Sequence, residues 1–293
     1  MLSAIRFLTE PFTPQYMQRA MLITLVLALL AGVVGVLVQL RELSFMSDAL
    51  THTVFPGVAI AFAAGQSLFV GALLAGAVSS VLLTFATRSK RIDQDSFVAL
   101  LLAGLFSIGV VVISRHHTYS ADLTALLFGR LLAVDTREVI ETAAVALVAL
   151  GVVVAMRKEL LLRAFDEIGA EAMGYSLLRI DLAVNLVVAL VVVAAVRAVG
   201  TALVVAFLIT PAATARLLCS TLTRLVVTSV AIGAIGAWLG LVISYDASIH
   251  QGWRLAPGAT IVVVLTAIFA TVAMYQGVRT RALGHRATRS ATT

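Results

Sequence analysis

The sequence has 293 residues, of which 61% are hydrophobic and only 12% are charged, and its net charge is +6. Soluble domains carry fewer apolar residues and about twice as many charged ones, so this composition excludes a soluble globular protein and indicates a chain that crosses a membrane. The positive residues are spread among short connections instead of forming one stripe, which argues against a nucleic-acid partner.

The first part of the chain, residues 1–20, is expected to lie at a membrane surface. It contains Glu10, Pro11 and Pro14 and lacks the short apolar core that marks a cleaved signal. The side chains expected to face lipid are Leu2, Ile5, Leu8 and Phe12. We expect a membrane domain over residues 21–278 and a basic cytoplasmic tail over residues 279–293.

Long apolar stretches follow this segment. The predicted spans are residues 21–40, 45–87 (long enough for two crossings), 97–114, 142–156, 182–196, 198–215, 225–245 and 255–278. Lipid offers no partner for free backbone groups, and the continuous apolarity of these stretches differs from the alternation of a barrel strand. The sequence therefore predicts an all-α bundle of eight or nine transmembrane helices.

The connections between the spans indicate their orientation. If the connection around Lys90 is placed inside, the alternation of the spans puts 14 of the 21 Lys and Arg residues on that same side. Because cytoplasmic loops are enriched in Lys and Arg, we expect this orientation. The longer connection of residues 157–180 is then cytoplasmic, and that of residues 115–136 is external.

The cytoplasmic connection has apolar residues at roughly helical spacing and acidic residues on the other faces. The apolar positions are Leu161, Phe165, Ile168, Ala172 and Met173, and the acidic positions are Asp166, Glu167 and Glu171. This pattern predicts one short amphipathic helix on the inner membrane surface. On this pattern alone, the helix either joins two spans or binds a partner.

The stretch SFMSDALTHTVFPG, residues 44–57, places Asp48 and His52 four residues apart, on one face of a helix. A carboxylate within a membrane span usually faces protein or a water-filled path. Pro56 and Gly57 follow directly, and because Pro removes a backbone donor we expect the helix to break beside the pair. Broken helices next to polar residues are a recurring way to build ion sites in transporters, and the hydroxyls of Ser47, Thr51 and Thr53 are candidates to support such a site.

Asp48 and His52 are too few to bind a transition metal selectively, since such ions take about four to six ligands. A two-fold dimer would double them. Carboxylate and imidazole suit Mn²⁺, Zn²⁺ or Fe²⁺, whereas copper(I) prefers sulfur. A structural ion pair that binds nothing remains the alternative at this point. The other polar candidates, expected to be solvated or interfacial, are His116, His117, Asp122, Asp246, His250 and Trp253.

The sequence also lacks two features. It has no GxxxxGK[ST] phosphate loop, so any step driven by ATP needs a partner subunit. Its single cysteine, Cys219, excludes an intrachain disulfide and a thiolate-rich metal site.

The segment RELSFMSDALTHTVFPGVAIAF, residues 41–62, resembles the permeases of manganese, zinc and iron ABC importers, the ABC-3 type. The likeness continues in order through ALLFGRLLAV, LLLRAFDEIGAEAMGYSLLRIDL, VGTALVVAFLITPAATARLL and LAPGATIVVVL, and spans roughly residues 7–278. Ser47 and Thr51 replace Gly and Ser of the family pattern, and both remain small.

The resemblance implies a multi-pass permease of the bacterial inner membrane with a type II importer fold. It implies a second permease copy or a related permease, a cytoplasmic ATP-binding subunit and an extracytoplasmic metal-binding protein. Asp48 and His52 match the family's metal-coordinating positions, and no permanent cofactor is implied. The coupling segment that it implies contains Leu161, Phe165, Asp166, Glu167, Ile168 and Gly174.

Two rival functions follow from the same residues. A proton-coupled secondary metal transporter would use Asp48 and His52 as a proton relay and would need no ATPase. An intramembrane enzyme would need a nucleophile or paired acids within the spans, and the long apolar stretches hold only one acidic residue. The sequence does not distinguish manganese from zinc or iron, nor a homodimer from a heterodimer.

Overall fold

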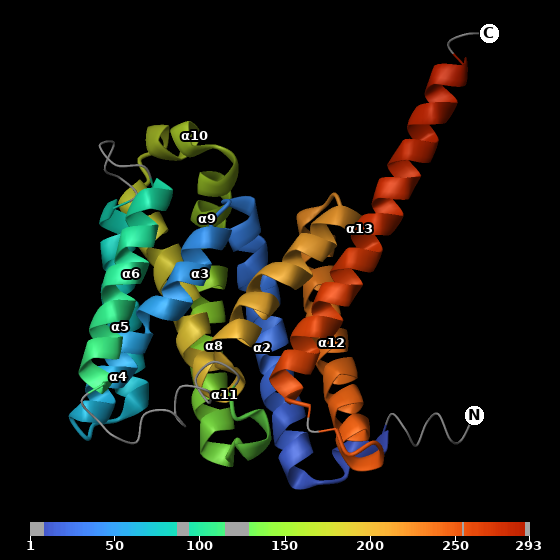
Figure 1. The fold of residues 1–293 in the computed structure, drawn as a ribbon. Coiled ribbons are helices and arrows are strands. Elements are labelled where there is room, and N and C mark those ends of the chain that lie inside the picture. The colour runs from blue at the N-terminus through green and yellow to red at the C-terminus, as the bar shows by residue number, and fades with distance from the viewer. Residues whose placement is uncertain (1–8, 87–93, 115–128, 254, 291–293) are drawn as a thin grey trace.

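The computed structural model describes residues 9–86, 94–114, 129–253 and 255–290, and these form a bundle of helices with no strand among them (Figure 1). In chain order the helices are η1 (Glu10–Phe12), α2 (Gln15–Leu40), α3 (Ser44–Thr53), α4 (Phe55–Ala63), α5 (Leu68–Ala86), α6 (Gln94–Ile113), η2 (Leu131–Ala133), α8 (Thr136–Ala155), α9 (Arg157–Phe165), α10 (Glu167–Ala172), α11 (Leu177–Leu218), α12 (Leu222–His250) and α13 (Pro257–Ser290).

Eight helical segments of the described chain are long and apolar enough to cross a membrane. α3 and α4 have only 10 and 9 residues and are not among them. However, α3 lies toward the end of the bundle that holds α9, and α4 lies toward the opposite end (Figure 1). Together they form a ninth crossing, so the predicted all-α bundle of eight or nine spans is confirmed.

The single helix α11 contains two of the predicted spans. Within it, Gly200 has φ 77° and ψ 162°, a conformation that essentially only glycine adopts. The helix bends there, and both arms run from the bend back toward the end where α9 and α10 lie (Figure 1). Gly129 packs against this bend so closely that a Cβ on it would collide with the backbone of Val199.

Several helices begin or end outside the predicted apolar stretches. α2 starts at Gln15 and not at residue 21, and α8 starts at Thr136, where Asp135 accepts the backbone N–H of Glu138 at 2.7 Å. Caps of this kind fix a helix end, and the apolar pattern does not report them. At the other end of the chain, α13 continues to Ser290. The interfacial role of residues 1–20 and the basic tail stay predictions, and residues 1–8 and 291–293 lie outside the described chain.

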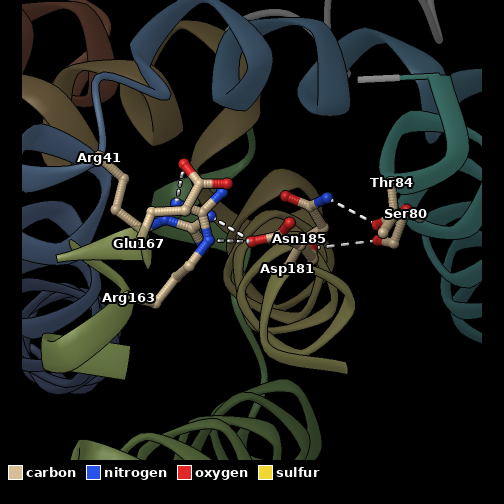
Figure 2. A network of polar contacts seen from close by, with 7 residues as sticks. All are labelled: Arg41, Ser80, Thr84, Arg163, Glu167, Asp181 and Asn185. Carbon is tan, nitrogen blue, oxygen red and sulfur yellow. Dashed lines mark hydrogen bonds and ion pairs between the residues drawn. The ribbon is translucent and has the colours of Figure 1, made fainter. Parts of the chain in front are cut away.

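Buried polar groups tie α5 to the first arm of α11. Asn185, only 4% exposed, donates from Nδ2 to Thr84 Oγ1 at 2.8 Å, and Ser80 donates to the Asn185 carbonyl at 3.0 Å (right side of Figure 2). In a membrane interior, where helices gain nothing from excluding water, such hydrogen bonds help to fix which helices pair. This clamp of Ser80, Thr84 and Asn185 therefore holds together helices that are far apart in the sequence.

Candidate functional site

Asp48 and His52 lie one turn apart on α3, on the same face. His52 Nε2 is 3.9 Å from Asp48 Oδ1, and the two side chains are 34% and 39% exposed, respectively. This separation is too long for a direct hydrogen bond. Two ligands that each sit about 2.0–2.2 Å from one metal ion are at most about 4.4 Å apart, so one cation can lie between these two atoms.

The helix that carries the pair is interrupted at Val54, directly after α3. Pro56 is the second residue of α4, where its missing N–H leaves no helical bond unmade, and Gly57 donates to the Val54 carbonyl at 3.1 Å. Gly57 also lies against the α5 backbone, where a Cβ would collide with the carbonyl oxygen of Gly71. The break beside His52 is thus held in place by close packing of α4 on α5.

The nearby hydroxyls do not face the Asp48–His52 pair, contrary to the expectation from sequence. Ser47, Thr51 and Thr53 are buried, and they donate to the carbonyls of Leu43, Asp48 and Leu50 at 2.9, 2.6 and 3.1 Å. Ser and Thr often bond to the carbonyl three or four residues earlier when no other acceptor is near. Their hydroxyls stabilise α3 itself.

An aromatic residue that sequence reasoning missed contacts the imidazole. The ring of Phe106 on α6 meets that of His52 edge to face, with centroids 6.3 Å apart at 84°, and it also lies 5.2 Å from the ring of Phe55. Sequence reasoning placed Phe106 within a predicted span, but nothing in the sequence pairs it with His52. Phe106 limits the orientations that the imidazole can adopt.

The two donors have no third partner in the described chain. No group of three or more His, Cys, Asp or Glu side chains there is close enough to bind a metal ion. The pair on α3 therefore offers two donors, fewer than the roughly four to six that a transition metal prefers. Because both side chains reach the surface of the single chain, further ligands can come from another subunit or from water.

The predicted cytoplasmic helix is in fact two helices, α9 and α10, divided at Asp166. The Asp166 carboxylate caps α10 by accepting the N–H of Gly169 at 2.8 Å, so this residue sets the local backbone. α10 ends at Ala172, and Gly174, two residues later, has φ 83°. Gly174 N–H donates to the Glu171 carbonyl at 2.9 Å and Tyr175 N–H to the Ala170 carbonyl at 3.1 Å, a Schellman turn.

The apolar residues of this region do not share one face. Phe165 and Ile168 are 71% and 82% exposed at the tip formed by α9 and α10, whereas Leu161 packs against the core of the bundle. Glu167 forms an ion pair with Arg163 at 2.8 Å. Of Leu161, Phe165 and Ile168, the large apolar residues of the expected coupling segment, the structure therefore leaves the last two available to a partner.

A buried cluster of charges lies beneath the tip (Figure 2). Asp181, at the start of α11, contacts the Arg41 guanidinium at the end of α2, and Arg163 Nε lies 3.3 Å from the same carboxylate oxygen. The side chains of Arg41, Asp181 and Arg163 are 8%, 12% and 17% exposed. Asp181 borders a predicted apolar span, which marks it as a charge in need of a partner, but it is 140 residues from Arg41.

The remaining polar candidates lie apart from the Asp48–His52 pair. Asp246 and His250 form an exposed pair on α12, with Oδ1 and Nδ1 2.9 Å apart, and Trp253 is 63% exposed nearby in the chain. Residues His116, His117 and Asp122 fall outside the described residues.

The sequence resembles curated proteins over most of its length. It is 36% identical over 254 residues to the manganese transport system membrane protein MntC of Listeria monocytogenes, covering 87% of this chain and 88% of that one. It is 35% identical to the manganese import system permease protein ScaB of Streptococcus gordonii, with 87% and 89% covered. A probable iron transport system membrane protein of Haemophilus influenzae is 30% identical, with 94% and 99% covered.

The fold resembles solved structures. A chain of PsaBC from Streptococcus pneumoniae, solved in complex with Fab, matches with a TM-score of 0.80 and 32% identity over 93% of this chain and 95% of that one. An inward-facing conformation of a putative metal-chelate type ABC transporter matches with a TM-score of 0.70 at 17% identity, which shows the fold alone. The importer fold expected from the resemblance is confirmed.

The family model described as ABC 3 transport family matches residues 13–276. This match covers the spans, the Asp48–His52 pair and the α9–α10 region. The chain is therefore a multi-pass protein of the bacterial inner membrane and belongs to the ABC 3 transport family.

Proposed function

We propose that this chain is the membrane permease of an ATP-driven importer for divalent transition metal ions, and that Asp48 and His52 coordinate the ion on its path. The observation that carries the proposal is one carboxylate and one imidazole 3.9 Å apart on a broken transmembrane helix. The names of the relatives, which mention manganese and iron, support this class of ion and place manganese first.

The ion site is completed by a second permease copy. One chain supplies one oxygen and one nitrogen donor, and a two-fold axis beside α3 doubles the set to two of each. The partial exposure of both side chains in the single chain supports this proposal, because a fully enclosed pair could not share an ion with a neighbour. Mn²⁺ and Fe²⁺ both accept such mixed ligands, so selection between them depends on the geometry of the site and on metal delivery.

Two further partners complete the importer. The exposed Phe165 and Ile168 dock into a groove of a cytoplasmic ATP-binding subunit, in the way that a helix binds an apolar groove. ATP hydrolysis belongs to that subunit, because this sequence has no phosphate-binding loop, and the permease itself performs no covalent chemistry. An extracytoplasmic metal-binding protein delivers the ion to the opposite side.

The proposal is tested by measuring manganese accumulation in cells that lack their own copy of this permease and express the wild-type chain or a variant of it. D48A and H52A should each lower the manganese content by at least about tenfold, since even outer residues of metal sites change affinity by 10–100-fold. The matched controls are D246A and H250A, which break another Asp–His pair with the same spacing of four residues. They should leave accumulation unchanged.

Wild-type content of manganese, iron and zinc in D48A cells would overturn the metal site. The rival function, proton-coupled transport, predicts uptake into vesicles that have a proton gradient and no ATP. Uptake of that kind by the wild-type protein would overturn the ATP-driven importer.

A further inference from the structure

Asp181 lies at the centre of a buried charge cluster that joins four helices (Figure 2). Its carboxylate contacts Arg41 and lies 3.3 Å from Arg163 Nε, and Arg163 Nη1 is 2.8 Å from Glu167 Oε2. Glu167 lies on α10, Arg163 on α9 and Asp181 on α11, and Arg41 caps the end of α2. The cluster thus runs from the exposed tip to the corner between α2 and α3.

That corner leads directly to the metal ligands. Arg41 is followed by Glu42, the only non-glycine residue of the described chain with a positive φ, at 56°. Leu43 N–H then donates to the Val38 carbonyl at 2.9 Å, and α3 begins at Ser44. Such a backbone conformation persists only where the surroundings enforce it, and it is common in switch regions. The contact between Arg41 and Asp181 holds the residue directly before Glu42.

The cluster is also incompletely satisfied in this conformation. Arg41 Nη1 and Arg163 Nε are buried and make no hydrogen bond, and on α9 the Oε2 atom of Glu159, one turn before Arg163, is in the same condition. A fully satisfied polar network fixes one arrangement, whereas buried groups that make no hydrogen bond favour a second arrangement in which they make one. Bistable contacts of this kind convert small shifts into discrete movements.

We propose that the Arg41–Asp181–Arg163 cluster transmits movement of the α9–α10 tip to α3 and so couples the ATPase to the metal ligands. These side chains are positioning residues, because they touch neither the ion nor ATP. The inference depends on the proposed function, in which the tip docks on the ATP-binding subunit. Its specific claim is that breaking the link between Arg41 and Asp181 separates ATP hydrolysis from transport in a complex that still assembles.

The test uses the complete complex of permease, ATP-binding subunit and metal-binding protein in liposomes. Manganese uptake and ATP hydrolysis are measured in the same vesicles, and their ratio is compared among R41Q, D181N and R41Q/D181N. D181N alone leaves two buried cations facing a neutral side chain, so we expect it to be less stable than the double variant. The double variant removes one charge of each sign and keeps Arg163 paired with Glu167, so it should assemble and melt like the wild type.

We expect the double variant to hydrolyse ATP and to transport at least about fivefold less manganese per ATP, the lower range of measured couplings between sites. A purely structural role for the cluster predicts the opposite, a normal ratio once the charges are balanced. A wild-type ratio in R41Q/D181N overturns the inference. The control is R137Q, which breaks an exposed ion pair with Glu141 (2.9 Å) on the opposite side of the membrane and should leave the ratio unchanged.

The same vesicles separate this inference from the proposed function. If wild-type vesicles take up manganese without ATP, the proposed function fails. If wild-type uptake needs ATP and the double variant keeps the wild-type ratio, only the inference fails.

Discussion

Replacing Gly57 by alanine is a direct test of how the broken helix is held. Gly57 lies in the first turn of α4, after the break at Val54, and packs against Gly71 and Ala75 of α5. A methyl group there would collide with the Gly71 carbonyl oxygen, which belongs to a helix backbone and cannot rotate away. α4 must move away from α5 by about 1 Å to restore ordinary contact distances of about 3.5 Å.

Two opposing effects set the size of the change. Alanine favours a helix over glycine by about 1 kcal/mol, whereas overpacking a tight contact typically costs about 1–3 kcal/mol. Because the obstacle is a backbone carbonyl, the cost should lie at the upper end. We therefore expect G57A to be destabilised by about 2 kcal/mol, which corresponds to a fall of about 5 °C in melting temperature for a domain of this size.

The assay is thermal unfolding of the purified protein in detergent, together with manganese accumulation in cells. The matched control is G104A on α6, where a Cβ would meet nothing within 4 Å. G104A gains the helix preference without the collision, so its melting temperature should stay the same or rise. G57A should also lose uptake, because a shift of α4 moves the break next to His52.

Equal melting temperatures for G57A and G104A, with full uptake in both, would refute the reasoning. That result would mean that α4 and α5 are farther apart than in the structure and that the break beside His52 is not fixed by their contact. A stable G57A protein without uptake would instead show that uptake depends on the position of the break and not on overall stability.

Three other substitutions probe the clamp and the tip. N185L removes the buried amide that bridges α5 and α11 and should lower the melting temperature, since such bonds contribute about 1–2 kcal/mol in membranes; an unchanged temperature argues against the clamp. F165S/I168S should melt normally, because both side chains are exposed, and should fail to retain the ATP-binding subunit on an affinity column; retention contradicts docking at the tip. G174A and G65A both force alanine into positive φ, at a cost of about 1–2 kcal/mol, but only G174A should impair uptake, and equal uptake would contradict a role for the tip.

The number and type of helices follow from the sequence because the bilayer imposes one simple rule. Uncharged stretches of about 20 residues must be helical, and the three predicted ones that reach this length without a charge, residues 21–40, 225–245 and 255–278, lie in α2, α12 and α13. The helix ends were predicted less well. α2 begins in the polar residues after Pro14, and α11 runs through a bend that depends on Gly200. These features depend on backbone hydrogen bonds and on single dihedral angles, which hydrophobicity does not encode.

In the proposed metal site too, contacts within one helix follow from the sequence, whereas contacts between helices do not. The spacing of Asp48 and His52 and the position of Pro56 are local facts, and they place both donors on one face beside a break. From the sequence, the hydroxyls of Ser47, Thr51 and Thr53 are candidates to support the site, but in the structure they donate to carbonyls near their own helix. Phe106 was missed because its contact with His52 crosses from α6 to α3.

For the buried charge cluster, the sequence predicts that Asp181 has a partner but does not identify that partner. An acid at the edge of an apolar span predicts that a partner exists, because an unpaired buried charge costs several kcal/mol. It does not say which of the 21 basic residues that partner is. Only the packing of α2 against α11 brings Arg41 to Asp181 across 140 residues of sequence, and the same packing places the cluster between the tip and α3. The sequence leaves the function of Asp181 open, and the proposed role follows from its position, since a charge that joins separate helices can transmit their movement.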